Sequence, residues 1–294
     1  MYTAGKYIKQ FLKISFRIIT IFCIIIVLYY AGRIFVCDQF VVPSYSMEPT
    51  LVAGDRILVN KLIFGARIYK SLNFSQGNPL KSWRTFAFGK IQPNDVIVFN
   101  YPKGYNREKI EFKINYVYVK RCIGTPGDTL SVINGFFKNN NYKSLIGIEY
   151  KQMEVSILPN DVNDYDIYLL SSHYKNYGWT VKNTGPVFVP QKGATVDIDS
   201  VNYKIYKEII EYETGKKIIA ENRKVILGNE NIDSYKFEKN YYFACGDNVL
   251  NSHDSRYWGF IPEEFIIGIA TYISYSKDPL TGELRKDRLM KIIK

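Results

Sequence analysis

Two serines lie between two prolines in the segment PSYSMEPTL, residues 43–51. Pro43 and Pro49 each fix their own φ angle and restrict the residue before them, so this loop is stiff. A stiff loop can hold one side chain in one orientation, and Ser46 is the candidate nucleophile. A serine hydroxyl is a weak nucleophile unless a neighbouring base takes its proton. The rest of the chain must therefore supply that base.

Histidine and lysine are the two kinds of base that we weigh. A Ser-His-Asp triad would need His173, in SSHYKNY, or His253, in NSHDSRYWGF, and both have the character of structural or surface residues. Lys120 stands in YVYVKRCIG, where strand alternation places it on one face with Tyr118 and Cys122. A lysine on an apolar face either extends its amine to solvent or is functional, and burial lowers its pKa. Lys120 meets the sequence requirement for the base, and the choice between lysine and histidine stays open on these residues alone.

The supply of metal ligands is small. The chain has 4 cysteines and 2 histidines, and no CxxC or HxxxH spacing occurs. We therefore expect no metal site, and the leading functional hypothesis given below needs no cofactor. Cys122 and Cys245 each lie inside a motif, and the sequence leaves open whether they form a disulfide or remain two buried thiols.

Charge and hydropathy point to a membrane rather than to nucleic acid. The net charge is +11, but the basic residues are scattered and no basic-aromatic nucleic-acid module is present. An apolar stretch, ISFRIITIFCIIIVLYYA, is just long enough to span a bilayer. We predict a transmembrane anchor at 14–36 and expect membrane lipid, not nucleic acid, as a partner.

The charges that flank the anchor predict its orientation. Only Arg33 closely follows the apolar core, whereas four basic residues precede it: Lys6, Lys9, Lys13 and Arg17. The positive-inside rule then keeps residues 1–13 in the cytoplasm and exports the body. A cleavable signal peptide is the alternative, but Tyr29 and Tyr30 are bulky where cleavage needs small residues, so we favour a retained anchor.

The body has the pattern of a mostly β fold. Short runs rich in β-branched and aromatic residues predict five strands: Arg56–Phe64, Asp95–Tyr101, Asn115–Gly124, Tyr241–Gly246 and Ile266–Ser276. No βα alternation indicates a parallel sheet. We predict an antiparallel β catalytic core, an inserted β-rich region and a basic, solvated C-terminal tail. The core would comprise residues 38–131 and 241–276, the inserted region residues 132–240, and the tail residues 277–294.

Five segments together resemble one family. PSYSMEPTL, GDRILVNK, DVIVFNYP, YVKRCIGTPGD and GDNVLNSHDSRYWGFIP occur in the order and spacing of type I signal peptidases, behind a single anchor. Beyond the anchor, the resemblance covers residues 40–62, 93–128 and 243–271. The long insert resembles the family only in its position.

The resemblance implies a role for each matching residue. Ser46 would be the nucleophile and Lys120 the general base. The backbone N–H of Ser46 and the hydroxyl of Ser44 would form the oxyanion hole, and Ser252 would orient the lysine. Two ion pairs would support the site: Arg121 with Asp247, and Asp254 with Arg256. The family usually has Arg-Asp after GDN, where this chain has Val249 and Leu250.

The apolar residues around the dyad are expected to bind substrate. Shallow pockets for small side chains would explain a preference for Ala-x-Ala before the cut, and their predicted walls are Phe40, Val42, Met47, Tyr118 and Val119. Leu51 fits ordinary core packing better.

The implied function is an endopeptidase that removes signal peptides from exported preproteins. It would act as a monomer on the outer face of the bacterial cytoplasmic membrane. Two alternatives remain open: a peptidase with a narrow substrate set, and a relative that binds signal peptides without cutting them. The self-cleaving serine-lysine repressors fit less well, because this chain has an anchor and no DNA-binding module.

Overall fold

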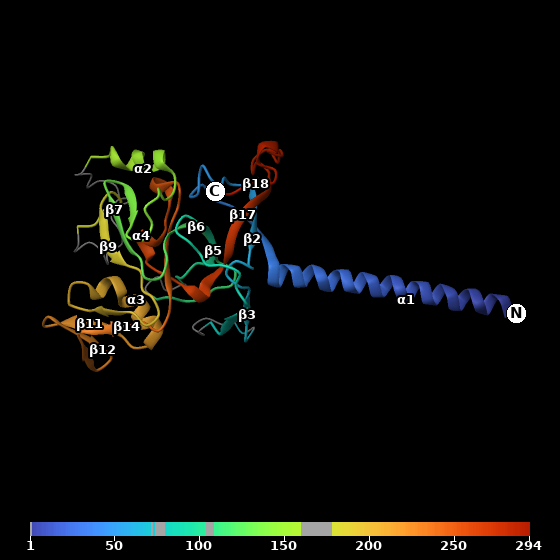
Figure 1. Ribbon diagram of the computed structural model, residues 1–294, viewed down its shortest axis with the longest axis horizontal. Helices are drawn as coiled ribbons and strands as arrows, with labels where there is room; N and C mark the ends of the chain where they lie inside the picture. Colours follow the sequence, from blue (N-terminus) through green and yellow to red (C-terminus); the bar gives the residue numbers. More distant parts are fainter. Residues whose placement is uncertain (1, 72, 74–79, 104–108, 160–177) are drawn as a thin grey trace.

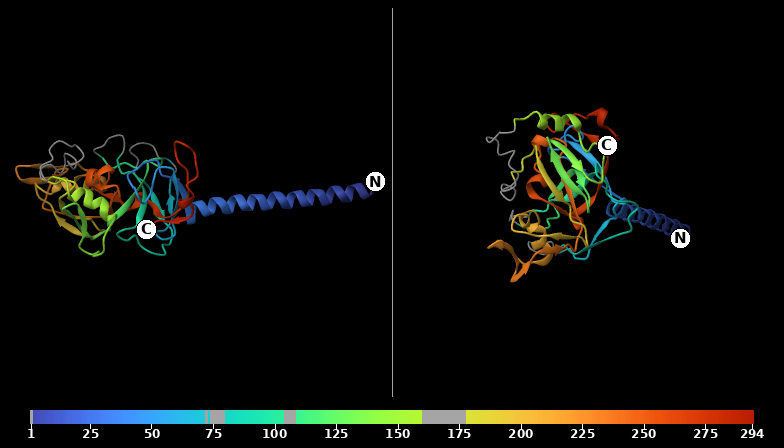
Figure 2. Two further views of the ribbon diagram at one scale, coloured as in Figure 1. Left: turned by 90° about the horizontal axis from the view of Figure 1, so that it is seen from above. Right: turned by 60° about the vertical axis from the view of Figure 1, so that its left-hand side comes forward.

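Helix α1 (Tyr2–Ala31) is a rod that extends away from the rest of the chain (Figures 1 and 2). The computed structural model describes residues 2–71, 73, 80–103, 109–159 and 178–294. Within Gln10–Val36, a window of 18 residues has a mean hydropathy of 2.5, and none of that window is buried against the protein. The 27 residues of Gln10–Val36 rise about 40 Å, which exceeds the roughly 30 Å of a hydrocarbon core. Length and composition thus fit a membrane anchor.

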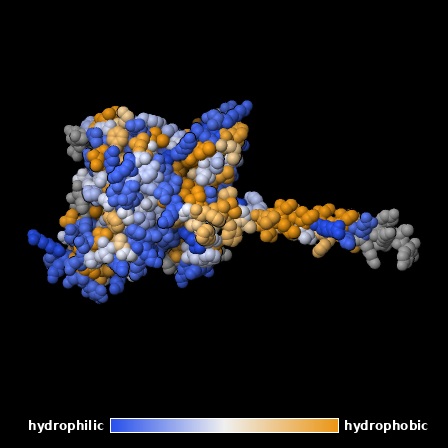
Figure 3. Space-filling view, viewed as in Figure 1, coloured by the Kyte–Doolittle hydropathy of each residue, from blue (hydrophilic) through white to orange (hydrophobic). Residues whose placement is uncertain are grey.

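The anchor is tied to the body where it ends. A π-helical turn, η1 (Gly32–Val36), leads into strand β1 (Cys37–Val41). Arg33 Nη2 lies 2.6 Å from Asp38 Oδ1, and Lys61 Nζ donates to the Arg33 carbonyl at 2.7 Å. Figure 3 shows the apolar surface of α1 continuing onto the adjoining face of the body.

One antiparallel sheet forms the centre of the body, as the sequence predicts. Its strand order is β1-β2-β17-β5-β6-β15-β16, and β18 pairs with β17. The added bounds are β2 (Asp55–Asn60), β5 (Val96–Asn100), β6 (Val117–Gly124), β15 (Tyr241–Cys245), β16 (Ile261–Pro262), β17 (Ile266–Ser276) and β18 (Lys291–Ile292). Burial alternates along β2, whereas β5 in the middle is buried throughout. All five predicted strands are present.

Smaller elements surround this sheet. A hairpin joins β3 (Arg67–Tyr69) to β4 (Ser82–Arg84), and four short helices are α4 (Ser255–Trp258), η3 (Val249–Asn251), η4 (Glu263–Phe265) and η5 (Lys286–Arg288). The β7-β8-β9 sheet contains β7 (Thr129–Ile133), β8 (Phe136–Asn139) and β9 (Thr184–Phe188). The remaining strands are β10 (Thr195–Asp197) with β14 (Ser234–Lys236), and β11 (Ile218–Glu221), β12 (Lys224–Leu227) and β13 (Glu230–Ile232).

The region 132–240 lies mainly at the end of the body that is far from α1 (Figures 1 and 2). It holds β-structure, as expected, and also α2 (Glu149–Ser156) and α3 (Tyr203–Thr214), which the weak strand pattern did not predict. The region shares the core of the body, because Tyr206 of α3 stacks on Phe260 with ring centroids 5.9 Å apart.

The C-terminal tail departs from its prediction at Arg288, whereas Lys286, Lys291 and Lys294 are exposed as expected. A solvated terminus was expected from its basic residues, but Arg288 is only 7% exposed and β18 pairs with β17. Arg288 is buried because its guanidinium faces the carboxylate of Asp55, with 2.6 Å between Nη2 and Oδ2. A buried cation needs such a partner to offset its desolvation.

Candidate active site

Ser46 lies in the loop between β1 and β2, and the core holds this loop from below. The side chains of Met47 and Leu51 are fully buried in the cluster beneath the loop. The Leu51 N–H donates to the Met47 carbonyl at 2.9 Å, which makes a tight turn. The turn leaves the Ser46 side chain partly exposed.

The structure brings the predicted nucleophile and the predicted base into contact. Lys120 lies opposite Ile97 in the pairing of β6 with β5, and its Nζ donates a hydrogen bond to Ser46 Oγ. Ser44 Oγ is 3.3 Å from Ser46 Oγ. The backbone N–H of Ser46 has no acceptor among the described residues, as an oxyanion donor requires.

Burial makes Lys120 a better base. The residue is only 4% exposed, and desolvation lowers the pKa of its amine to about 8. The nearby Asp254 carboxylate and Cys245 thiol oppose this shift, whereas the Arg256 guanidinium adds to it. An amine with a pKa of about 8 is partly neutral near neutral pH, so it can accept a proton from Ser46.

This pKa predicts the pH dependence of activity. Because only neutral Lys120 can accept the Ser46 proton, kcat/KM should rise with pH and level off above the pKa of about 8. At pH 6 it should be roughly one hundredth of the plateau, since the neutral fraction falls tenfold per pH unit below the pKa. Initial rates between pH 5 and about 10 would measure this. A flat profile from pH 5 to about 8 would contradict a lysine base.

Both predicted ion pairs are present behind the dyad. Arg121 Nε and Nη2 donate to Asp247 at 2.6 and 2.7 Å, and Arg256 Nε and Nη2 donate to Asp254 at 2.8 and 2.7 Å. All four residues are buried. Two-pronged guanidinium–carboxylate contacts fix orientation as well as charge. The Arg121–Asp247 pair joins β6 to the segment after β15, and the Arg256–Asp254 pair fixes the fold within that segment.

The segment after β15 also contacts the nucleophile loop directly. The Asn248 N–H donates to the Ser46 carbonyl at 3.1 Å, and the Gly246 N–H donates to Asp254 Oδ2 at 3.0 Å. A Cβ at Gly246 would lie 2.4 Å from the Ser46 carbonyl oxygen and 2.2 Å from Ser252 Oγ. Only glycine allows this close approach. The pattern of the sequence does not reveal this role, because the approach depends on the fold.

Ser252 lies beside the dyad but does not make the predicted hydrogen bond. It is 7% exposed, and its Oγ has no hydrogen-bond partner in the part of the chain that the structure describes. Leaving a buried hydroxyl unpaired costs about 1–3 kcal/mol. Its role in orienting Lys120 stays a prediction.

An apolar cavity of about 360 Å³ opens next to Ser46 and Lys120. Four of the five residues predicted to bind substrate line it: Phe40, Val42, Tyr118 and Val119. The fifth, Met47, is fully buried in the core beneath the loop, as is Leu51. Met47 therefore supports the loop in this conformation and does not line the cavity. Ser44 and His253 complete the polar part of the lining.

The two histidines considered as alternatives to Lys120 have different outcomes. His253 lines the cavity, and its ring stacks on Tyr257 with centroids 5.2 Å apart, whereas the hydrogen bond to Ser46 Oγ comes from Lys120. His173 lies outside the described residues. Cys122 and Cys245 are buried free thiols on neighbouring strands, which answers the question of a disulfide that the sequence left open.

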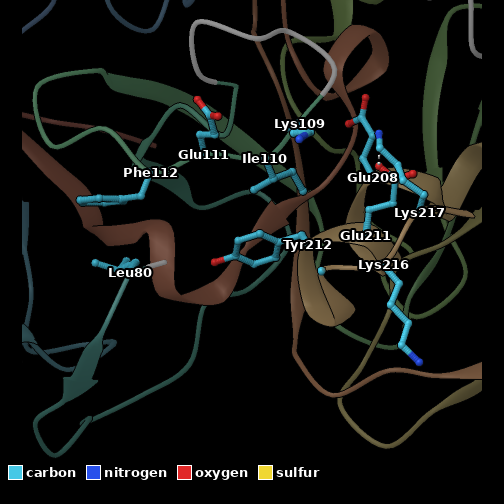
Figure 4. Close-up of a pocket in the computed structure, with 11 residues that line it drawn as sticks. Leu80, Lys109, Ile110, Glu111, Phe112, Glu208, Glu211, Tyr212, Lys216 and Lys217 are labelled. Carbon is cyan, nitrogen blue, oxygen red and sulfur yellow. Dashed lines mark hydrogen bonds and ion pairs between the residues drawn. The ribbon is translucent and has the colours of Figure 1, made fainter. Parts of the chain in front are cut away.

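A second cavity, of about 250 Å³, lies between α3 and the residues that precede β6 (Figure 4). Its walls combine the rings of Phe112 and Tyr212 with carboxylates, and Glu211 there pairs with Lys217 at 3.3 Å. It shares no lining residue with the cavity beside Ser46. The predicted catalytic residues thus gather at the first cavity.

Comparison with known proteins shows similarity to one protein family over most of the chain. The family described as signal peptidase, peptidase S26, matches residues 15–275. Signal peptidase I of Buchnera aphidicola subsp. Baizongia pistaciae is 28% identical over 258 residues, which cover 85% of this chain and 73% of that protein. Signal peptidase I of Aquifex aeolicus is 28% identical over 266 residues, which cover 88% of this chain and 84% of that protein. Signal peptidase I of Pseudomonas aeruginosa is 28% identical over 264 residues, which cover 86% of this chain and 70% of that protein.

Proposed function

The chain belongs to the signal peptidase family, peptidase S26, and from this premise we propose that it is a membrane-anchored endopeptidase that removes signal peptides with Ser46 as nucleophile and Lys120 as general base. Membership of the family implies a peptidase. The observation that carries the assignment of residues is the hydrogen bond from Lys120 Nζ to Ser46 Oγ, at the edge of an apolar cavity. Buried Lys120, with its lowered pKa, supports a serine-lysine mechanism.

The proposed reaction has two halves. Neutral Lys120 takes the proton of Ser46 Oγ as that oxygen attacks the scissile carbonyl carbon, and a tetrahedral oxyanion forms. The C–N bond then breaks, Lys120 Nζ gives the proton to the leaving amine, and the signal peptide remains as an ester on Ser46. Water attacks the ester, Lys120 accepts and returns a proton, and the free carboxylate leaves.

Ser44 is proposed to stabilise the oxyanion together with the Ser46 N–H. Ser44→Ala should therefore lower kcat about 100-fold with little change in KM, because one preorganised donor is worth about 3 kcal/mol in the transition state. Ser44→Thr, which keeps the hydroxyl, is the matched control and should retain most of the activity. Equal kcat values for Ser44→Ala and the wild type would show that the Ser44 hydroxyl does not stabilise the oxyanion.

The cavity suggests which peptides fit. Its lining beside Ser46 is mostly apolar, which supports the binding of uncharged, apolar side chains before the cut. We propose that these side chains are small, as in Ala-x-Ala. The anchor supports a site of action at the membrane surface, with lipid and signal peptides as partners. The basic residues before the apolar core support a cytoplasmic N-terminus and a body on the outer face of the bacterial cytoplasmic membrane.

The test is cleavage of a preprotein by the purified full chain in detergent. The new N-terminus should follow the Ala-x-Ala site, and a matched preprotein with Phe in place of the last Ala should remain uncut. Cutting at other positions, or equal cutting of both preproteins, would contradict the proposed specificity. Binding of the preprotein without any cleavage would instead favour the non-cleaving relative.

A further inference from the structure

The C-terminal tail returns to the sheet beside the active-site loop. It lies beyond residues 15–275, which match the family. The chain leaves β17, forms a bridge between Lys277 and Leu284, and comes back as β18, where Ile292 lies opposite Tyr272 (Figure 1). The Lys294 carbonyl and Thr50 Oγ1 both accept from Arg121 Nη2, so the end of the tail lies close to the loop that follows Ser46.

Arg288 joins two points of that loop. Its Nε donates to Asp55 Oδ1 at 2.8 Å, and its Nη2 donates to Asp55 Oδ2 at 2.6 Å and to the Thr50 carbonyl at 2.9 Å. Asp55 Oδ2 also accepts a hydrogen bond from the Val52 N–H at 2.8 Å. One buried guanidinium thus fixes the backbone at Thr50 and, through Asp55, at Val52.

Thr50 is held from its other side by the ion pair behind the dyad. Its Oγ1 donates to Asp247 Oδ2 at 2.5 Å and accepts from Arg121 Nη2 at 3.2 Å. Arg121 Nη2 also donates to the Lys294 carbonyl at 3.1 Å, so the tail meets this network at a second point. Thr50 is therefore clamped between the tail and the Arg121–Asp247 pair.

The clamp lies one turn from the nucleophile. The hydrogen bond from the Leu51 N–H to the Met47 carbonyl ties the residue after Thr50 to the residue after Ser46. A displacement of Thr50 is therefore carried to Ser46 Oγ and alters its contact with Lys120. A misplacement of about 1 Å between reacting groups can cost about 100-fold in rate.

We propose that Arg288 is a positioning residue for Ser46, and that the tail is a strap that holds the nucleophile loop against Lys120. This inference rests on the proposed function, since it concerns the rate of the same reaction. Arg288 is absent from the lining of the cavity beside Ser46. Its loss should therefore lower kcat and leave KM nearly unchanged.

The test compares variants of the full chain in detergent, each assayed well below its own unfolding temperature. Arg288→Met should lower kcat about 30-fold with KM within about twofold, by the misplacement argument. The kcat of Arg288→Lys should lie between those of Arg288→Met and the wild type. An ammonium can pair with Asp55 but lacks the planar guanidinium that also reaches the Thr50 carbonyl. Lys291→Met, on the exposed side of β18, is the matched control and should keep the wild-type kcat.

A double variant separates positioning from stability. Arg288→Met leaves the Asp55 charge buried and unpaired, which destabilises the fold, and adding Asp55→Asn removes that charge. The unfolding temperature should recover while kcat stays low, since nothing holds the Thr50 carbonyl. Recovery of kcat together with the unfolding temperature, or a wild-type kcat in Arg288→Met, would overturn the inference. A wild-type chain that cuts no preprotein would contradict the proposed function and, with it, this inference.

Discussion

Lys120→Arg should abolish cleavage although it preserves the positive charge. The guanidinium of arginine stays protonated at any pH at which the protein is folded, so it cannot take the proton of Ser46. Removing the general base from a serine nucleophile should cost at least about 1,000-fold in kcat. Rates of preprotein cleavage for Lys120→Arg, Lys120→Met and the wild type would measure the loss.

A change of pH separates the base from a purely electrostatic role. The wild type should gain activity as the pH rises toward the Lys120 pKa of about 8, whereas Lys120→Arg should remain inactive at every pH. A conservative control is Lys90→Arg, because Lys90 is exposed and lies outside the cavity lining. Activity within about tenfold of the wild type in Lys120→Arg would show that Lys120 serves only as a charge.

Gly246→Ala should also cause a large loss of activity. The added Cβ would lie 2.2 Å from Ser252 Oγ and 2.4 Å from the Ser46 carbonyl oxygen, so the two segments must move apart. The loop that carries Ser46 would shift relative to Lys120, and a shift of about 1 Å can cost about 100-fold in kcat. Cleavage rates, measured with circular dichroism to show that the chain stays folded, would test this.

The control for this substitution is Gly32→Ala. A Cβ at Gly32 would meet no atom within 4 Å, so this variant should cleave at the wild-type rate. Adding Ser252→Ala to Gly246→Ala would remove only the contact with Ser252 Oγ and would leave those with the Ser46 carbonyl oxygen, at 2.4 Å, and with Cβ of residue 252, at 2.6 Å, so the activity should stay low. Full activity in Gly246→Ala would mean that the contact between these segments does not position Ser46.

The sequence predicts the central sheet well because its strands carry local signals. Residues 96–100 and 117–124 are runs of β-branched and aromatic residues, and both are strands. The helix α3 was missed, although Tyr206, Ile209 and Ile210 follow the helical spacing i, i+3, i+4 and are buried together. That spacing lies among many polar residues, which made the insert look irregular.

The site is only partly predictable from the sequence. The positions of Ser46 and Lys120 follow from the stiff loop and from a lysine on an apolar strand. The close approach at Gly246 and the clamp on Thr50 depend on segments about 200 residues apart, and no local pattern encodes such distances. Arg288 looked like one more solvated charge, because a basic tail gives no sign of the buried Asp55 that it meets.

The most direct test of the central claim is one cleavage assay with three proteins. The wild type, Ser46→Ala and Lys120→Met would be given the same preprotein with an Ala-x-Ala site at about pH 9, where Lys120 of the wild type is largely neutral. We predict that only the wild type yields the mature protein and that both variants still bind the preprotein. Cleavage by either variant at a rate near that of the wild type would contradict a dyad of Ser46 and Lys120, and survival of activity in Lys120→Met would direct attention to His253.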